Sequence, residues 1–223
     1  MSRYFAFKLF KIPVAYVSHG IVLVSGLTRD AMVEILDYVY KAAELISDTE
    51  KNNMLETLLT ALKEKRRVFV VGAGRSGLVA RAFAMRLMHL GFYVYVMGET
   101  IMPPLDPGDV LIAVSGSGRT KTVVAVAEAA KAVGARIIAL TSYPDSPLAR
   151  LADIIVRIPG RTKLALEEDY LIRQVRGIHE PLAPLGTLFE VTTMVFLDGV
   201  VVELMYKLGI TEEEMKERHA NIE

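Results

Sequence analysis

The sequence contains no cysteine, and it has only four histidines. Without cysteine, the chain has no disulfide framework, no thiolate metal site and no cysteine nucleophile. The histidines show neither a His-x-His nor a His-Glu-x-x-His spacing, so we expect no metal site of the usual kind. A net charge is also missing, because 26 lysines and arginines balance 26 aspartates and glutamates. This balance gives no global reason to expect a nucleic acid or an anionic membrane as partner.

The length limits the number of domains. A chain of 223 residues, 52% of them hydrophobic, suffices for one α/β domain with an additional helical layer and is short for two domains. Residues 1–27 stand apart, since basic residues precede an apolar stretch, as in a signal peptide. His19 interrupts that stretch and no clear cleavage site follows it. We therefore favour a flexible or partner-covering extension, or a translation start placed too early, over secretion, and expect residues 28–223 to form a single cytoplasmic domain.

From residue 28 onward, the apolar pattern alternates between helical and strand types. Short β-branched runs predict buried strands at residues 68–71, 92–97, 110–114, 136–140 and 153–158. Helical spacing predicts helices at residues 28–46, 52–64, 78–90, 123–133 and 188–208. We expect Thr28 to cap the first helix, and the first two helices to pack on the sheet or on a neighbouring subunit. The alternation predicts an α/β fold with a five-stranded parallel sheet flanked by helices on both faces.

A loop rich in hydroxyls and glycine follows the strand at 110–114. It places three hydroxyls and two glycines within six positions, namely Ser115, Gly116, Ser117, Gly118 and Thr120. Glycine lets the backbone approach a ligand, hydroxyls donate hydrogen bonds, and the first amides of a helix carry partial positive charge. The alternative is a simple helix cap, but a cap needs only one hydroxyl. The loop therefore predicts a phosphate-binding cradle.

A second glycine-rich turn, GAGRSG, follows the strand at 68–71. It contributes Gly72, Gly74, Arg75 and Ser76. Its spacing also fits the G-x-G-x-x-G of a dinucleotide-binding fold, and Glu99 stands where such an enzyme would bind ribose. Three observations argue against a dinucleotide site. A dinucleotide fold needs no second, hydroxyl-rich loop, Arg75 and Ser76 are donors suited to a small anion, and the strands are too few for a separate substrate domain. We therefore favour a small-anion site.

The segment PLGTLFE opens the long apolar helix at 188–208. Thr187 and Glu190 have the spacing of a capping box, which is a sufficient structural reason for both residues. A functional reason competes with it, because a carboxylate on the first turn of this helix is placed to act as a base on a bound ligand. Both explanations stay open at this point.

Five segments of the chain together resemble the 6-phospho-3-hexuloisomerase family of sugar isomerase (SIS) domains. They are GAGRSGLVARAFAMRLMHLG, SGSGRT, PGRTK, PLGTLFE and RHANIE. The resemblance covers residues 32–223 and implies a three-layer α/β/α sandwich. It implies a homotetramer that interconverts D-arabino-hex-3-ulose 6-phosphate and D-fructose 6-phosphate, in formaldehyde fixation or pentose synthesis. It also implies that SGSGRT holds the phosphate, that GAGRSG lines the sugar, and that Glu190 is the catalytic base, without metal or cofactor. His219 corresponds to a histidine that reaches a neighbouring subunit's site.

Other functions and roles remain open. A phosphosugar-sensing module would keep the hydroxyl-rich loop without turnover, although no basic helix-turn-helix accompanies it here. Another isomerase with the same domain would differ only in the walls of its sugar pocket. His219 has a structural alternative, a surface position in a frayed tail that follows a helix capped by Thr211 and Glu214. We expect His89 to be structural and keep His179 as a secondary site candidate.

Overall fold

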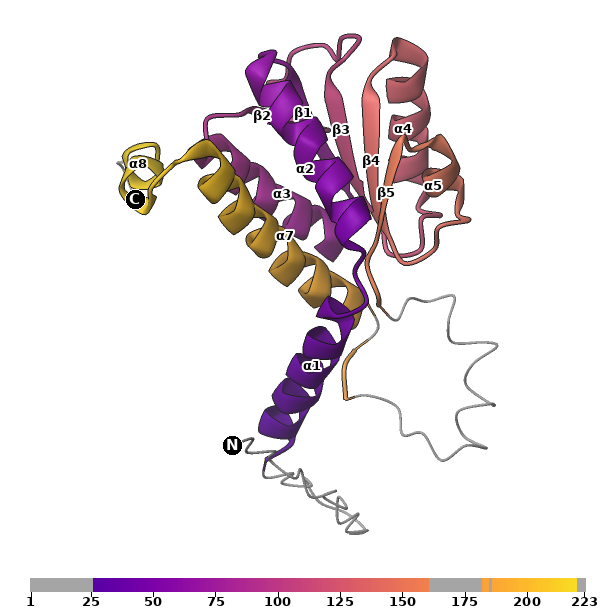
Figure 1. Ribbon diagram of the computed structural model, residues 1–223. Coiled ribbons are helices and arrows are strands. Elements are labelled where there is room, and N and C mark those ends of the chain that lie inside the picture. Colours follow the sequence, from indigo (N-terminus) through magenta and orange to yellow (C-terminus); the bar gives the residue numbers. More distant parts are fainter. Residues whose placement is uncertain (1–25, 161–181, 185, 220–223) are drawn as a thin grey trace.

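The computed structural model of this protein describes residues 26–160, 182–184 and 186–219 (Figure 1). The predicted N-terminal extension lies outside the described residues except for its last two positions, and so does His179. In chain order the elements are α1 (Leu27–Ala43), α2 (Asp48–Lys63), β1 (Arg67–Gly72), α3 (Arg75–His89), β2 (Tyr93–Val96), β3 (Val110–Val114), α4 (Lys121–Val133), β4 (Arg136–Thr141), α5 (Pro147–Leu151), β5 (Ile154–Arg157), α7 (Thr187–Leu208) and α8 (Glu212–Glu217).

The strands form one parallel sheet of five, in the order β2-β1-β3-β4-β5. All five residues of the central strand β3 are buried, because both faces of the sheet are covered. The predicted parallel sheet is thus confirmed. Since all strands run the same way, the loops that follow β1, β3 and β4 emerge at one edge, the lower edge of the sheet in Figure 1. We call this the carboxyl edge.

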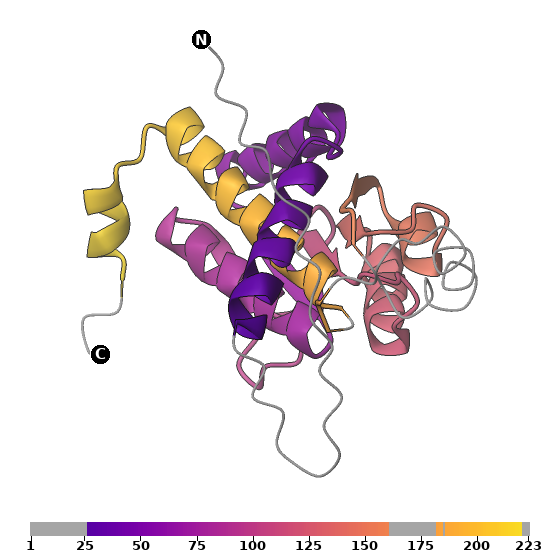
Figure 2. The same cartoon turned by 90° about the horizontal axis from the view of Figure 1, so that it is seen from below.

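Helices cover the two faces as separate layers (Figure 2). On one face, α2, α3 and α7 pack in a hydrophobic cluster with strand residues such as Val70 and Ile112. On the other face, α4 and α5 pack with Phe69 and Leu111, the alternate residues of the same strands. The short α5 helix lies between β4 and β5, in a stretch for which the sequence analysis predicted no helix. This arrangement confirms the three-layer α/β/α sandwich.

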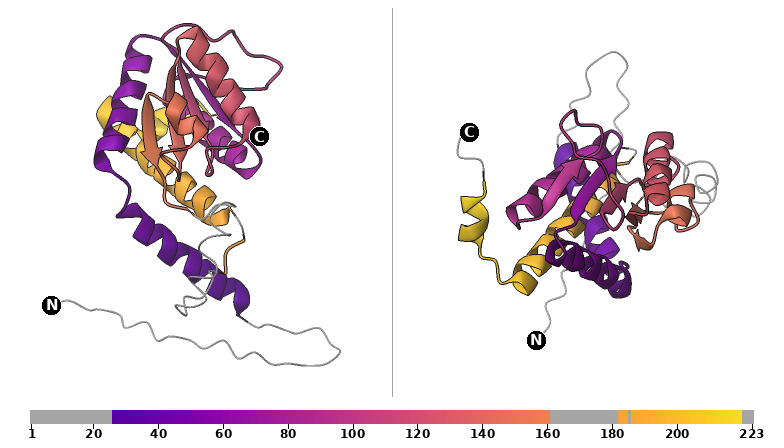
Figure 3. Two further views of the ribbon diagram at one scale, coloured as in Figure 1. Left: turned by 90° about the vertical axis from the view of Figure 1, so that its right-hand side faces the viewer. Right: turned by 90° about the horizontal axis from the view of Figure 1, so that it is seen from above.

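Helix α1 departs from its prediction at its start, and within the described residues it packs on α7 rather than on the sheet. It begins at Leu27, and Gly26 rather than Thr28 is the N-cap, without a side-chain cap hydrogen bond. Only Val39 and Ala42 are buried, because the helix contacts α7 and extends below the sheet (Figure 3). The expected capping by Thr28 is therefore wrong, and the described part of the chain leaves most of the apolar residues of α1 exposed or only half-buried.

Candidate active site

The hydroxyl-rich loop after β3 lies at the carboxyl edge, where open α/β sheets bind ligands. Ser115 is buried, and its Oγ lies 3.0 Å from Oγ1 of Thr120. Thr120 stands at the N-cap of α4, yet its side chain makes no capping hydrogen bond. The Oγ of Ser117 accepts a hydrogen bond of 3.2 Å from the backbone N–H of Arg119. Because no hydroxyl caps α4 in the usual way, the first amides of this helix stay open to an anion, which favours the cradle over simple capping.

The loop after β4 fixes the shape of this cradle. Gly118 has φ of 59°, and a Cβ there would lie 2.0 Å from Oγ of Ser146, so only glycine fits. The backbone N–H of Leu148 donates to the carbonyl of Gly118 at 3.0 Å, and Oγ1 of Thr141 donates to the carbonyl of Gly116 at 3.2 Å. The sequence analysis missed this supporting role of Thr141 and Ser146. The available signal was a hydroxyl at the last residue of a buried strand, Thr141, followed by a second hydroxyl, Ser146, before Pro147.

The GAGRSG turn brings β1 and α3 into close backbone contact. A Cβ on Gly72 would lie 2.8 Å from the backbone nitrogen of Gly77, which explains both glycines. Gly74 is the N-cap of α3, with φ of 56°, and apart from its two chain neighbours no described residue has an atom within 4 Å of the place a Cβ would take there. The helix begins at Arg75, earlier than the predicted residue 78, so Arg75 and Ser76 occupy its first turn at the carboxyl edge.

Two ion pairs on α3 involve residues of the two alternative interpretations, the small-anion site and the dinucleotide site. Nε of Arg75 donates to Oε2 of Glu190, from the first turn of α3 to the first turn of α7. Arg81, further along α3, pairs with Glu99, the residue that a dinucleotide site would direct at ribose. The contact between Arg75 and Glu190 joins two residues that the sequence nominated separately.

The start of α7 tests the structural explanation for Glu190, the capping box. Gly186, with φ of 90°, is the N-cap, and Thr187 is already the first helical residue. The predicted capping box of Thr187 and Glu190 is therefore wrong, since no side chain caps this helix. The Glu190 side chain is only 13% exposed, and its carboxylate turns to Arg75 instead. A Cβ on Gly186 would lie 3.2 Å from Oε1 of Glu190, so this glycine leaves room for the carboxylate.

His219 lies at the other end of α3. Its ring packs on His89, with 5.0 Å between the ring centroids, and Nη1 of Arg218 donates to the carbonyl of His89 at 2.9 Å. The predicted capping box of Thr211 and Glu214 is confirmed, and the Thr211 backbone N–H holds the pKa of Glu214 below its usual value. Because Arg75 and His89 are the end residues of α3, about 20 Å separates His219 from Glu190 along this helix. One chain therefore does not bring Glu190 and His219 together.

Among the described residues, no group of three or more histidine, aspartate or glutamate side chains is arranged to hold a metal ion. None of the described helices has the length and hydropathy that crossing a membrane requires.

Comparisons with known proteins agree with this geometry. The SIS domain model matches residues 61–167, which include the GAGRSG turn and the hydroxyl-rich loop. A 3-hexulose-6-phosphate isomerase of Bacillus subtilis is 39% identical over 196 residues, covering 88% of this chain and 99% of that protein. One of Mycobacterium gastri is 47% identical over 157 residues, covering 70% and 74%. The crystal structure of a Methanococcus jannaschii protein, from which a 3-hexulose-6-phosphate isomerase function was inferred, superposes with a TM-score of 0.66 at 34% identity, covering 88% and 98%.

Proposed function

This chain belongs to the SIS-domain family of 3-hexulose-6-phosphate isomerases, and we propose that it interconverts D-arabino-hex-3-ulose 6-phosphate and D-fructose 6-phosphate in the cytoplasm. The reaction proceeds through an enediolate and uses a carboxylate base, without a metal ion or an organic cofactor.

The observation that carries this proposal is the position of Glu190. Its carboxylate is nearly buried and takes no part in capping α7. It contacts Arg75 in the first turn of α3, at the GAGRSG turn. A carboxylate held in this way, beside a glycine-rich turn and at the same edge as an anion cradle, is the arrangement that proton transfer on a bound sugar phosphate needs.

The chemistry balances with one base. From fructose 6-phosphate, Glu190 takes the proton from C3, the C3–H electron pair forms the C2=C3 double bond, and the carbonyl electrons move to O2. A proton then passes from O3 to O2, and Glu190 returns its proton to C2, which leaves the carbonyl at C3. The same carboxylate ends as it began, so the cycle needs no other acid or base at carbon.

The hydroxyl-rich loop supplies the remote binding energy. Ser115, Ser117 and Thr120 hold the phosphate together with the first amides of α4, while Gly72, Gly74, Arg75 and Ser76 line the sugar. Fixing the phosphate holds C2 and C3 near the base, which lowers the entropic part of the barrier.

A metal-free assay in deuterated water tests the function. Fructose 6-phosphate incubated with the purified protein is expected to gain deuterium at C3 and to yield a 3-ulose, both followed by NMR. A protein that binds the sugar phosphate but produces neither signal contradicts the proposal and points to a sensing module or to an isomerase for another sugar.

We further propose that copies of this chain assemble into a homotetramer whose sites are shared. Three residues on one face of α1, Met32, Leu36 and Tyr40, are 58%, 63% and 69% exposed. Val195 and Val202 on α7 are also exposed. A monomer rarely leaves so much apolar surface uncovered.

The groove between α1, α2 and α7 supports the same assembly. It encloses about 290 Å³ and is lined by Val39, Thr192, Val195 and Gly199, among others. Gly199 lies in the middle of α7, where glycine weakens a helix, yet apart from its own turn of helix no atom of the described residues lies within 4 Å of the position its Cβ would take. Oγ1 of Thr192 is buried, without a hydrogen-bond partner among the described residues. A backbone that approaches from a second copy gives Gly199 a reason.

An active site shared between subunits predicts that two impaired variants rescue each other. In mixed assemblies of Glu190→Gln and His219→Asn chains, some sites combine an intact Glu190 with an intact His219 from another copy. We expect the co-expressed mixture to turn over faster than the summed rates of the two variants made separately, with assembly size checked by light scattering. Equal rates, or a monomer in solution, would contradict the shared site.

A further inference from the structure

The guanidinium of Arg75 reaches the candidate base with one nitrogen and faces solvent with the rest. Nε donates to Oε2 of Glu190. The Arg75 side chain is 61% exposed, against 13% for Glu190. A molecule that enters the carboxyl edge therefore meets the guanidinium before it meets the carboxylate.

The two terminal nitrogens of Arg75 remain available. A guanidinium carries five N–H donors in a planar fork. Of the five donors of Arg75, only Nε–H makes a hydrogen bond to a described residue. Arg81, about one and a half turns further along the same helix, directs its terminal nitrogen to Glu99 instead. Arg75 thus combines a fixed inner nitrogen with a free outer fork.

The proposed reaction needs such a fork. When Glu190 removes a proton from carbon, a negative charge develops on O2, and it moves to O3 when the proton passes between the oxygens. A base alone leaves that charge without a partner, and water at an open edge stabilises it less well than a preorganised donor. In a cis-enediolate the two oxygens lie side by side, as the oxygens of a carboxylate do, and a guanidinium fork binds such pairs with two parallel hydrogen bonds.

We propose that Arg75 is a catalytic residue whose terminal nitrogens donate to O2 and O3 of the enediolate while its Nε holds Glu190 beside C2 and C3. This inference rests on the proposed function and goes beyond the lining role that the sequence suggested for Arg75. One side chain then aligns the base with the carbons and stabilises the charge, whichever oxygen carries it. Because both directions of the reaction pass through the same enediolate, the fork assists both.

Substitutions of Arg75 test the inference by separating kcat from KM. We expect Arg75→Gln to lower kcat by about 10²- to 10³-fold, as for loss of an oxyanion donor, while KM changes only a few-fold because the phosphate cradle is intact. Arg75→Lys is expected to recover little, since an ammonium is a point charge without the fork. Arg81→Ala, which removes an exposed arginine from the same helix, is the matched control and is expected to keep wild-type kcat.

Two further measurements exclude a merely structural role. Added guanidinium chloride at millimolar concentration is expected to raise kcat of Arg75→Ala and to leave Arg81→Ala unchanged. A hydroxamate analogue of the enediolate is expected to lose affinity for Arg75→Gln by the same factor as kcat, whereas inorganic phosphate binds both proteins alike.

The outcomes distinguish this inference from the proposed function. A wild-type protein that does not isomerise fructose 6-phosphate refutes the function, and this role of Arg75 with it. Wild-type turnover together with an Arg75→Gln variant that keeps most of its kcat, or that loses phosphate and hydroxamate binding equally, refutes the role of Arg75 alone.

Discussion

Replacing Glu190 with glutamine is expected to lower kcat by about 10³-fold, because an amide cannot accept the proton from carbon. The fold is expected to persist, since Glu190 does not cap α7 and glutamine has nearly the same volume. Steady-state rates with fructose 6-phosphate, and deuterium exchange at C3, measure the effect. Exchange should fall with turnover, because both need the same proton transfer.

Ser117→Ala is the matched contrast to this variant. The phosphate contact exists in the ground state and in the transition state alike, so its loss should raise KM more than it lowers kcat.

If Glu190→Gln instead keeps more than about a tenth of wild-type kcat, Glu190 is not the general base.

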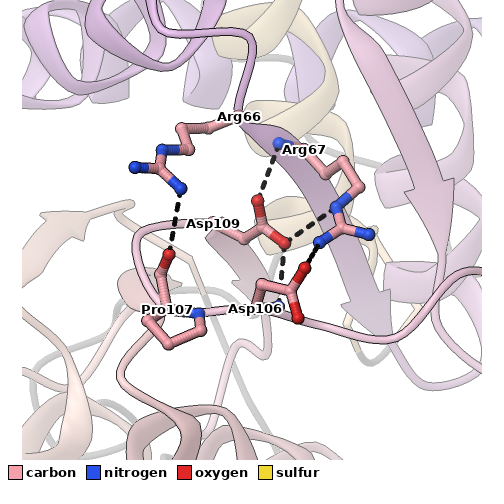
Figure 4. Close-up of polar contacts among 5 residues, drawn as sticks. All are labelled: Arg66, Arg67, Asp106, Pro107 and Asp109. Carbon is pink, nitrogen blue, oxygen red and sulfur yellow. Dashed lines mark hydrogen bonds and ion pairs between the residues drawn. The ribbon is translucent and has the colours of Figure 1, made fainter.

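Removal of the Asp109 carboxylate is expected to cost about 3 kcal/mol of unfolding free energy, since it leaves two partly buried backbone N–H donors without a partner and takes away one of the two carboxylates that pair with Arg67. Asp109 is only 2% exposed and directly precedes β3. Its carboxylate accepts hydrogen bonds from the backbone N–H and Nε of Arg67, at 2.9 and 3.0 Å, and from the backbone N–H of Asp106 at 2.9 Å (Figure 4). These contacts tie the start of β1 to the start of β3.

The Asp109→Ala variant is best compared with Asp37→Ala by urea denaturation at 25 °C. Asp37 pairs with Lys41 on the surface of α1, with both side chains more than half exposed, and its loss should change stability by less than about 1 kcal/mol. Because Asp109 lies at the edge of the sheet opposite the candidate site, the folded Asp109→Ala protein is expected to keep its kcat. A stability loss no larger than that of Asp37→Ala would show that the Arg67 network contributes little.

Local pattern was enough to predict most of the fold. All five strands follow from short apolar runs, and the two glycine-rich loops follow from residue types that only a close turn requires. The prediction was wrong where two local sequence patterns could each begin the same helix. The spacing of Thr187 and Glu190 fits a capping box, but Gly186 takes the N-cap position, so the carboxylate is released from the helix end.

The parallel sheet, the carboxyl edge that carries both loops, and the family could all be predicted from the order of residues. These properties depend on neighbours in the chain, namely apolar runs, glycines and hydroxyls that stand together. Three other features arise only in the folded chain: Arg75 contacts Glu190 across 115 positions, His219 lies at the far end of α3, and α1 extends away from the sheet. Such contacts depend on the angle at which each helix crosses the sheet, and that angle is set by side-chain packing over the whole interface rather than by any one segment.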